Sequence, residues 1–124
     1  MDLDSESKRL SRLDKLVKAS EFQRVFKLGN LKSHDRGFVV LALENDLGFA
    51  RLGFTVAKKN VASSVARNRI KRLIRESFRH NKSNLKSLDV VVIVRRGTDK
   101  IDNQGISAAL EKHWQRLAKL YLAQ

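Results

Sequence analysis

Hydrophobic residues recur along this chain with two periods, one typical of α-helices and one typical of β-strands. When residues 66–80 are placed on a helix, most apolar side chains fall on one side and most Lys and Arg side chains on the other. The apolar side holds Ile70, Leu73, Ile74, Ser77 and Phe78, with Ala66 nearby. Ser63 and Ser64 are alternative N-cap residues. The pattern predicts an amphipathic helix with one packing face.

The strand period occurs on both sides of a predicted turn. Residues 37–43 and 49–57 flank the turn sequence NDLG and predict two strands. In the second strand, apolar residues alternate with polar or small ones, as expected for a strand whose two faces differ. Residues 88–95 form a β-branched run that suits a central strand covered on both faces.

A short helix is predicted over residues 21–28. Ser20 as N-cap and Gln23 three residues later fit a capping box, in which both side chains satisfy backbone N–H groups. Gly29 suits the position just past the end of a helix.

The C-terminal segment predicts another helix, over residues 104–122, with Asp102 or Asn103 as its N-cap. Its packing stripe consists of Ile106, Leu110, Trp114, Leu117 and Tyr121. Residues 1–11 have few apolar groups, so we predict a flexible lead-in followed by a single domain over residues 12–124. The fold class is α+β, a sandwich in which helices pack on a sheet.

Charge is concentrated in one stretch of the chain. Residues 56–82 hold nine Lys and Arg residues against the single acid Glu76, a net charge of +8 out of the chain's +13. Repulsion between cations one turn apart destabilises the isolated helix, so a polyanion is the natural partner. The alternative is a solvated basic face without a ligand. The abundance of Arg favours phosphate, because guanidinium groups donate in bidentate fashion.

Composition excludes several other classes of protein. The chain has no cysteine, so it cannot form disulfides or thiolate metal sites. Its longest apolar run, residues 90–94, is far too short to span a bilayer. The N-terminus is acidic where a secretory signal needs positive charge. We therefore expect a cytoplasmic protein, and the pI near 10.7 favours nucleic acid over a membrane as its partner.

No self-contained nuclease site is evident from the sequence. The three histidines, His34, His80 and His113, are too scattered to suggest a metal triad. The carboxylates fall on different predicted elements, so no pair stands out as general acid and base. The glycines form no phosphate-binding loop.

Two long segments carry a resemblance to a known family. Residues 67–79 read RNRIKRLIRESFR, and residues 51–59 read RLGFTVAKK. Together they resemble the signature of the protein subunit of bacterial ribonuclease P. The resemblance extends to EFQRVF at residues 21–26 and to LDVVVIVRRG at residues 88–97, and so covers about residues 12–120.

The resemblance implies a fold and a function. The implied fold is a two-layer sandwich with a mixed sheet of about four strands and an additional short strand that the pattern does not reveal. It also has a left-handed crossover into the basic helix, although parallel crossovers are usually right-handed. The implied enzyme is a ribonucleoprotein endonuclease that removes the 5′ leader from precursor tRNA. Its partners are the catalytic RNA and precursor tRNA, with no obligate protein partner evident. The cofactor Mg²⁺ is held mainly by the RNA subunit.

The resemblance also implies two sets of binding residues and no catalytic or metal-binding residue in the protein. On pattern alone Phe22 and Phe26 are either core residues or an aromatic pair on which unpaired bases stack. In the family the matching aromatics line a cleft for the leader, which we extend to Lys15 and Val40. Some relatives carry a further aromatic residue where this chain has Leu41. The basic motif that contacts the RNA subunit consists of Lys58, Lys59, Arg67, Asn68, Arg69, Lys71, Arg72 and Arg75.

Other functions stay open at this point. A general RNA-binding module, such as a ribosomal or chaperone protein, could use the same basic helix without recognising a leader. A protein-only nuclease would need a carboxylate cluster, which the sequence does not show. A helix that binds in a DNA groove would favour duplex DNA over structured RNA in competition.

Overall fold

Four strands form one mixed sheet in the computed structural model, which describes residues 14–16 and 18–124. The strands are β1 (Leu31–His34), β2 (Phe38–Glu44), β3 (Arg51–Thr55) and β4 (Leu88–Val94), arranged in the order β1-β2-β4-β3. Strand β4 pairs antiparallel with β2 and parallel with β3. The predicted lead-in, residues 1–11, lies outside the described residues. The predicted central strand is confirmed, because β4 has a neighbour on each side and is buried on both faces.

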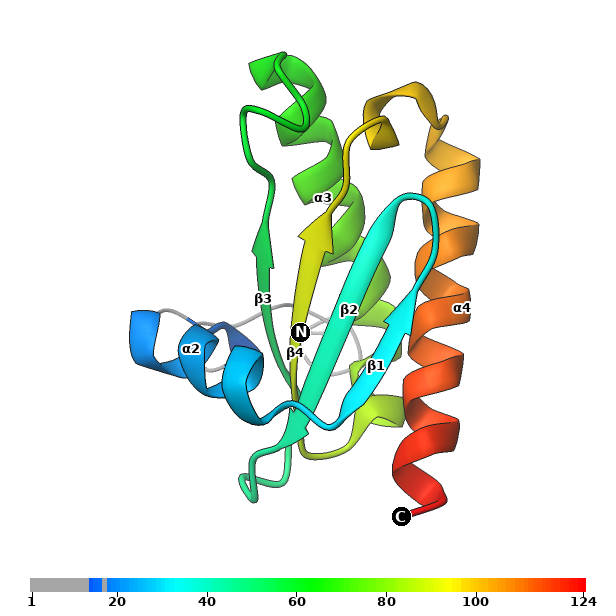
Figure 1. Ribbon diagram of the computed structural model, residues 1–124. Helices are drawn as coiled ribbons and strands as arrows, with labels where there is room; N and C mark the ends of the chain where they lie inside the picture. Colours follow the sequence, from blue (N-terminus) through cyan, green and yellow to red (C-terminus); the bar gives the residue numbers. More distant parts are fainter. Residues whose placement is uncertain (1–13, 17) are drawn as a thin grey trace, which may run out of the picture.

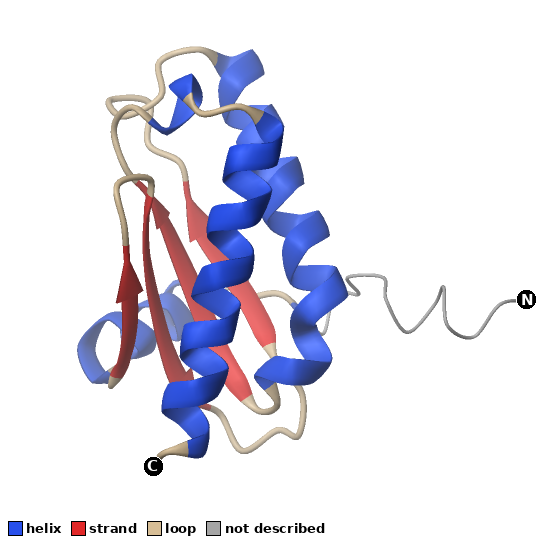
Figure 2. Cartoon of the chain, turned by 90° about the vertical axis from the view of Figure 1, so that its right-hand side faces the viewer, coloured by secondary structure: helices blue, strands red, loops and turns tan. Residues whose placement is uncertain are grey.

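Helices cover the two faces of the sheet unequally (Figures 1 and 2). The long helices α3 (Ser64–Asn81) and α4 (Asn103–Leu122) lie side by side on one face and form the second layer of the sandwich. The short helix α2 (Ala19–Leu28) crosses part of the opposite face, where it contacts β2 and β4. Single turns of 3₁₀ helix, η2 (Lys82–Leu85) and η3 (Thr98–Lys100), precede β4 and α4. The predicted α+β sandwich is confirmed.

The crossover between the two parallel strands is left-handed. In Figure 1 both strands point upward, β4 lies to the right of β3, and α3 passes behind the sheet. Figure 2, turned by 90°, places α3 and α4 on the side of the sheet opposite α2. Left-handed crossovers of this kind are rare. In this protein the crossover leaves the outer side of α3 next to the edge strand β3.

The main core lies between the sheet and the α3–α4 layer. Trp114 is 1% exposed and packs edge-on against Phe78 at 5.9 Å between ring centroids. Its indole N–H donates to the hydroxyl of the buried Ser77 at 2.8 Å, which satisfies both polar groups in the apolar interior. A smaller cluster of Leu16, Val25 and Val91 lies under α2. Each layer of the fold is therefore fixed to the sheet by its own apolar contacts.

Helix starts were predicted with mixed success. Ser63 caps α3, since its hydroxyl accepts from Ala66 N at 3.2 Å, and Asp102 caps α4. The predicted N-cap of α2, Ser20, is wrong. That helix begins at Ala19, and the backbone N–H of Lys18 donates to Glu21 Oε1 at 3.0 Å. Glu21 therefore determines where α2 begins, because its carboxylate accepts the backbone N–H of the residue before the helix.

Strand boundaries differ from the prediction at the edges of the sheet. The strand predicted over residues 49–57 is shorter, spanning Arg51–Thr55, and the edge strand β1 is the short strand that the pattern did not reveal. In the part of the chain that the structure describes, no helix is both long and apolar enough to cross a membrane.

Candidate nucleic-acid interface

An arginine fixes helix α2 on the sheet. The Arg51 guanidinium donates to both oxygens of Asp89, at 2.8 and 2.7 Å, and to Glu21 Oε2 of α2 at 2.6 Å. Asp89 is 1% exposed and also accepts from Asn45 Nδ2 at 2.8 Å. The hydrogen bond to Asp89 raises the pKa of Arg51 against the opposing effect of burial. Two carboxylates that looked unrelated in the sequence are thus held together, and they serve packing.

A glycine lets the aromatic ring of Phe22 lie against the sheet. A Cβ atom on Gly53 would come within 2.6 Å of Phe22 Cζ, closer than atoms can approach. The half-buried ring therefore rests on the backbone of β3. Beside it Leu16 N donates to Leu52 O at 2.9 Å, which adds the N-terminal segment to the edge of the sheet. Phe22 and Lys15, two of the predicted cleft residues, line the same cavity of about 180 Å³.

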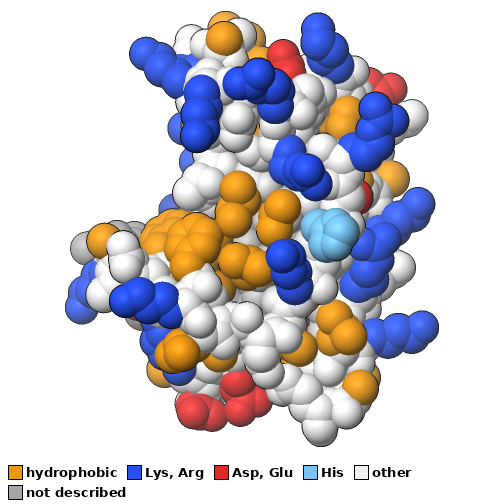
Figure 3. Space-filling model, in the orientation of Figure 1, with side chains coloured by type: hydrophobic (Ala, Val, Ile, Leu, Met, Phe, Trp, Pro, Cys, Tyr) orange, Lys and Arg blue, Asp and Glu red, His pale blue; other side chains and the backbone are white. Residues whose placement is uncertain are grey.

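Beyond this cavity the sheet face on the α2 side is apolar and partly open. Phe26, one turn after Phe22, is 47% exposed. Val39, Leu41 and Ile93 are half-buried on the same face of the sheet, with Val39 opposite Ile93 across the β2–β4 pair. Figure 3 shows hydrophobic side chains gathered over α2 and the middle of this face, with Lys and Arg side chains around them. We call Phe22, Phe26, Val39, Leu41 and Ile93 the apolar patch.

Val40 does not belong to the apolar patch, so its predicted place in a cleft with Phe22 is wrong. It is 0% exposed and lies in the main core under α3 and α4. Side chains alternate along a strand, so its neighbours Val39 and Leu41 face α2 instead. A shift of one residue in the prediction moved the side chain to the wrong face.

The outer side of α3 and the loop before it present much of the predicted basic motif. Lys58, Lys59, Asn68, Arg72 and Arg75 are exposed, and Lys71 is partly exposed. The Arg75 guanidinium lies 5.3 Å from the centre of the Phe54 ring of β3 and also lines the cavity beside Phe22. Arg72 lies 3.9 Å from Glu76, a loose contact between exposed groups. Stacking holds Arg75 in place while leaving its N–H donors available to a ligand.

Arg67 and Arg69 are engaged inside the protein. Arg67 donates to the carbonyl groups of Val61 and Ala62, at 3.0 and 2.8 Å. Arg69 donates to Asn103 Oδ1 at 2.7 Å, and it also reaches the main-chain oxygens of Asp99 and Ile101 at 3.0 and 3.3 Å. These two residues shape the loop before α3 and the connection into α4. Sequence alone did not separate them from the exposed members of the motif.

A Ser–His–Asp cluster, in which the serine and histidine are buried, ties the edge strand to α4. Ser33 Oγ lies 2.6 Å from His113 Nδ1, and His113 Nε2 lies 2.9 Å from Asp35 Oδ2, a close contact without hydrogen-bond alignment. Arg116 also donates to Ser33 Oγ at 3.0 Å. Burial lowers the pKa of His113, against the opposing charge of Asp35. Because His113 is 0% exposed, no substrate reaches it, and the cluster has a structural role.

Comparison with known proteins identifies relatives over most of the chain. The Ribonuclease P family model matches residues 10–118. The Ribonuclease P protein component of Chromohalobacter salexigens is 44% identical over 108 residues, which cover 87% of this chain and 84% of the relative. That of Pseudomonas aeruginosa is 42% identical over 113 residues, covering 91% and 84%.

Solved structures agree in fold. The RNase P protein from Staphylococcus aureus, solved at 2.0 Å, superposes with a TM-score of 0.76 at 35% identity and covers 82% of this chain and 93% of that one. The RNase P protein from Thermotoga maritima superposes with a TM-score of 0.72 at 32% identity, covering 82% and 96%.

Proposed function

This chain belongs to the ribonuclease P family and is a protein subunit of that tRNA-processing endoribonuclease, and on this premise we propose a division of labour between its two faces. The apolar patch binds the single-stranded 5′ leader of precursor tRNA. The exposed basic side chains of α3 and the loop before it bind the catalytic RNA.

The observation that carries the leader assignment is the exposed aromatic ring beside an apolar sheet face. Phe26 is 47% exposed on a helix that Arg51 holds firmly to the sheet. A protein face of this kind offers stacking to unpaired bases, each worth about 1–3 kcal/mol. Lys15 and Arg75, at the neighbouring cavity, are placed to meet the backbone phosphates. A duplex would hide its base faces, so a single strand is the better ligand.

Contacts of the α3 face suit an RNA backbone. Arg75 is oriented by Phe54, and Lys58 and Lys59 extend from the loop that Arg67 braces. Such groups bind phosphate and 2′-hydroxyl oxygens, which fixes position more than sequence. Their charge also lowers the repulsion between two polyanions, the catalytic RNA and its precursor substrate.

Catalysis is assigned to the RNA. Within the described residues, no group of three His, Cys, Asp or Glu side chains could hold a metal ion. Asp89 and Glu21 are both engaged by Arg51, so they do not fit a Mg²⁺ site. We therefore assign Mg²⁺, with the phosphodiester hydrolysis that it supports, to the RNA subunit. The protein favours precursor over product because the product has lost the leader contacts.

The test is cleavage of a labelled precursor tRNA at low Mg²⁺ by a bacterial ribonuclease P RNA, with and without this protein, beside the protein alone. We expect cleavage at the mature 5′ end only when both components are present. Binding of RNA without any stimulation of cleavage would refute the proposal and favour a general RNA-binding module.

A further inference from the structure

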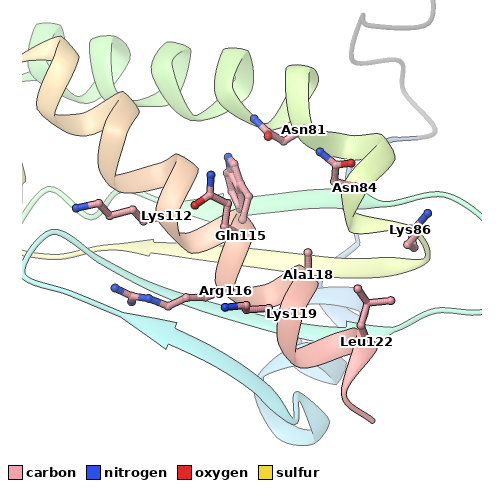
Figure 4. Close-up of a pocket in the computed structure, with 10 residues that line it drawn as sticks. Asn81, Asn84, Lys86, Lys112, Gln115, Arg116, Ala118, Lys119 and Leu122 are labelled. Atoms are coloured by element: carbon pink, nitrogen blue, oxygen red, sulfur yellow. The ribbon is translucent and has the colours of Figure 1, made fainter.

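A second hollow, unrelated to the apolar patch, lies on the helical side of the molecule. It is an open groove of about 810 Å³ between α4 and the corner where α3 passes into η2 (Figure 4). Four of its described lining residues are cationic, Lys86, Lys112, Arg116 and Lys119, and none is a carboxylate. Groups with this charge repel one another unless an anion lies between them.

Three of these cations are available to a ligand. Arg116 is committed to the edge strand, where it donates to Ser33 Oγ at 3.0 Å and His34 O at 3.3 Å. Lys86, Lys112 and Lys119 are exposed. Figure 4 shows their ammonium groups at separate points along the groove. The arrangement resembles a line of contacts rather than a cradle for one small ion.

Amide side chains and an apolar surface, which forms the larger part of the exposed lining, complete the groove. Asn84 and Gln115 are exposed on the two walls, and an amide both donates and accepts hydrogen bonds. Ala118 and Leu122 contribute the apolar surface, whereas the Trp114 ring is 1% exposed and offers no aromatic anchor. A protein partner without acidic groups would leave these lysines unpaired, whereas the phosphates of a nucleic-acid strand pair with them.

The groove continues from the basic side of α3. Lys86 lines both this groove and an adjoining hollow of about 500 Å³, which Arg79, His80 and Lys82 of the α3–η2 corner also line. Lys82 is paired there with Asp14 at 3.0 Å. Cationic side chains therefore run from the outer side of α3 around η2 to α4.

We propose that the groove binds a backbone segment of the catalytic RNA, as a second contact that extends beyond the α3 face. Lysines engage phosphates, and the amides of Asn84 and Gln115 meet 2′-hydroxyl groups or bridging phosphate oxygens. The inference rests on the proposed function, since it names more of the surface through which this subunit holds its RNA.

The first test measures binding of the isolated ribonuclease P RNA as a function of salt. The groove variant is Lys86→Gln/Lys112→Gln/Lys119→Gln. The matched control, Lys18→Gln/Lys27→Gln/Lys32→Gln, removes the same charge from exposed positions on the α2 side. For three lost phosphate contacts, the slope of log K against log salt should fall by about 2.1–2.7 in the groove variant. A slope equal to that of the control overturns the inference.

A second readout places the RNA directly. Because the chain has no cysteine, Ala118→Cys carries a short photoactivatable crosslinker at one position in the groove. We expect crosslinks to the RNA subunit from this site and none from Ser20→Cys on α2. An absence of crosslinks at position 118, in protein that still stimulates cleavage, refutes the groove contact alone. Wild-type protein that fails to stimulate cleavage refutes the proposed function itself.

Discussion

Replacing Phe26 with alanine isolates the contribution of base stacking to leader recognition. The ring is already half-covered in the free protein, at 47% exposure, so a base gains access to only part of it. We therefore expect a loss of about 1–2 kcal/mol, in the lower part of the range for one stacked base, or about 5- to 30-fold in Kd. The free energy of unfolding should change by less than about 1 kcal/mol, because the side chain is outside both cores.

The assay is equilibrium binding of precursor and mature tRNA to the assembled ribonucleoprotein. Phe26→Ala should weaken binding of the precursor and leave binding of mature tRNA unchanged, since only the precursor carries a leader. Leu28→Ala is the matched control, because Leu28 lies on the same helix, is 62% exposed and has no aromatic face. Equal losses for both tRNAs, or an equal effect of Leu28→Ala, would refute the stacking assignment.

Three further predictions test the supports of the two faces. Gly53→Ala should displace the α2 aromatic ring, lower the melting temperature and weaken precursor binding; unchanged values would show that the ring is free to move. Arg69→Ala should lower the free energy of unfolding by about 1–3 kcal/mol, measured by urea denaturation. Arg75→Ala should instead lower the slope of log K against log salt for RNA binding by about 0.7–0.9. A stability loss for Arg75→Ala together with a slope change for Arg69→Ala would contradict their assigned roles. Burial lowers the folded-state pKa of His113, so the stability it contributes is complete above about pH 6.5, its unfolded value, and is lost as pH falls through the folded pKa. His113→Gln should flatten this dependence in denaturation at several pH values, while the exposed His80→Gln should retain it.

Long periodic segments made most of the fold predictable. The stripe through Ile70 and Phe78 placed α3, and the β-branched run of β4 placed the central strand. Strand β1 was not predicted because it has only four residues, and three of them, Lys32, Ser33 and His34, are polar. Its place at the edge depends on the buried His113 of α4, which no local pattern reveals.

The sequence predicted which segment carries the binding surface, but not which of its side chains are free to bind. The basic motif located α3, but nothing local distinguishes Arg69, which braces a distant loop, from Arg75, which stacks at the surface. The Arg51 contacts join residues 30 and 38 positions apart, so they arise from tertiary packing alone. The prediction for Val40 was wrong for a simpler reason, because successive side chains of a strand point to opposite faces of the sheet.

The strand order has a consequence for how this protein forms in the cell. Strands β2 and β3 are not neighbours, and each pairs with β4, the last strand to be synthesised. A nascent chain that has exposed only its first three strands therefore lacks the partner that joins them, while its basic helix has already left the ribosome. Folding must wait for distant contacts, which slows it relative to locally connected folds. Until β4 pairs with both strands, the apolar side of α3 cannot complete the core that it shares with Val90 and Val92.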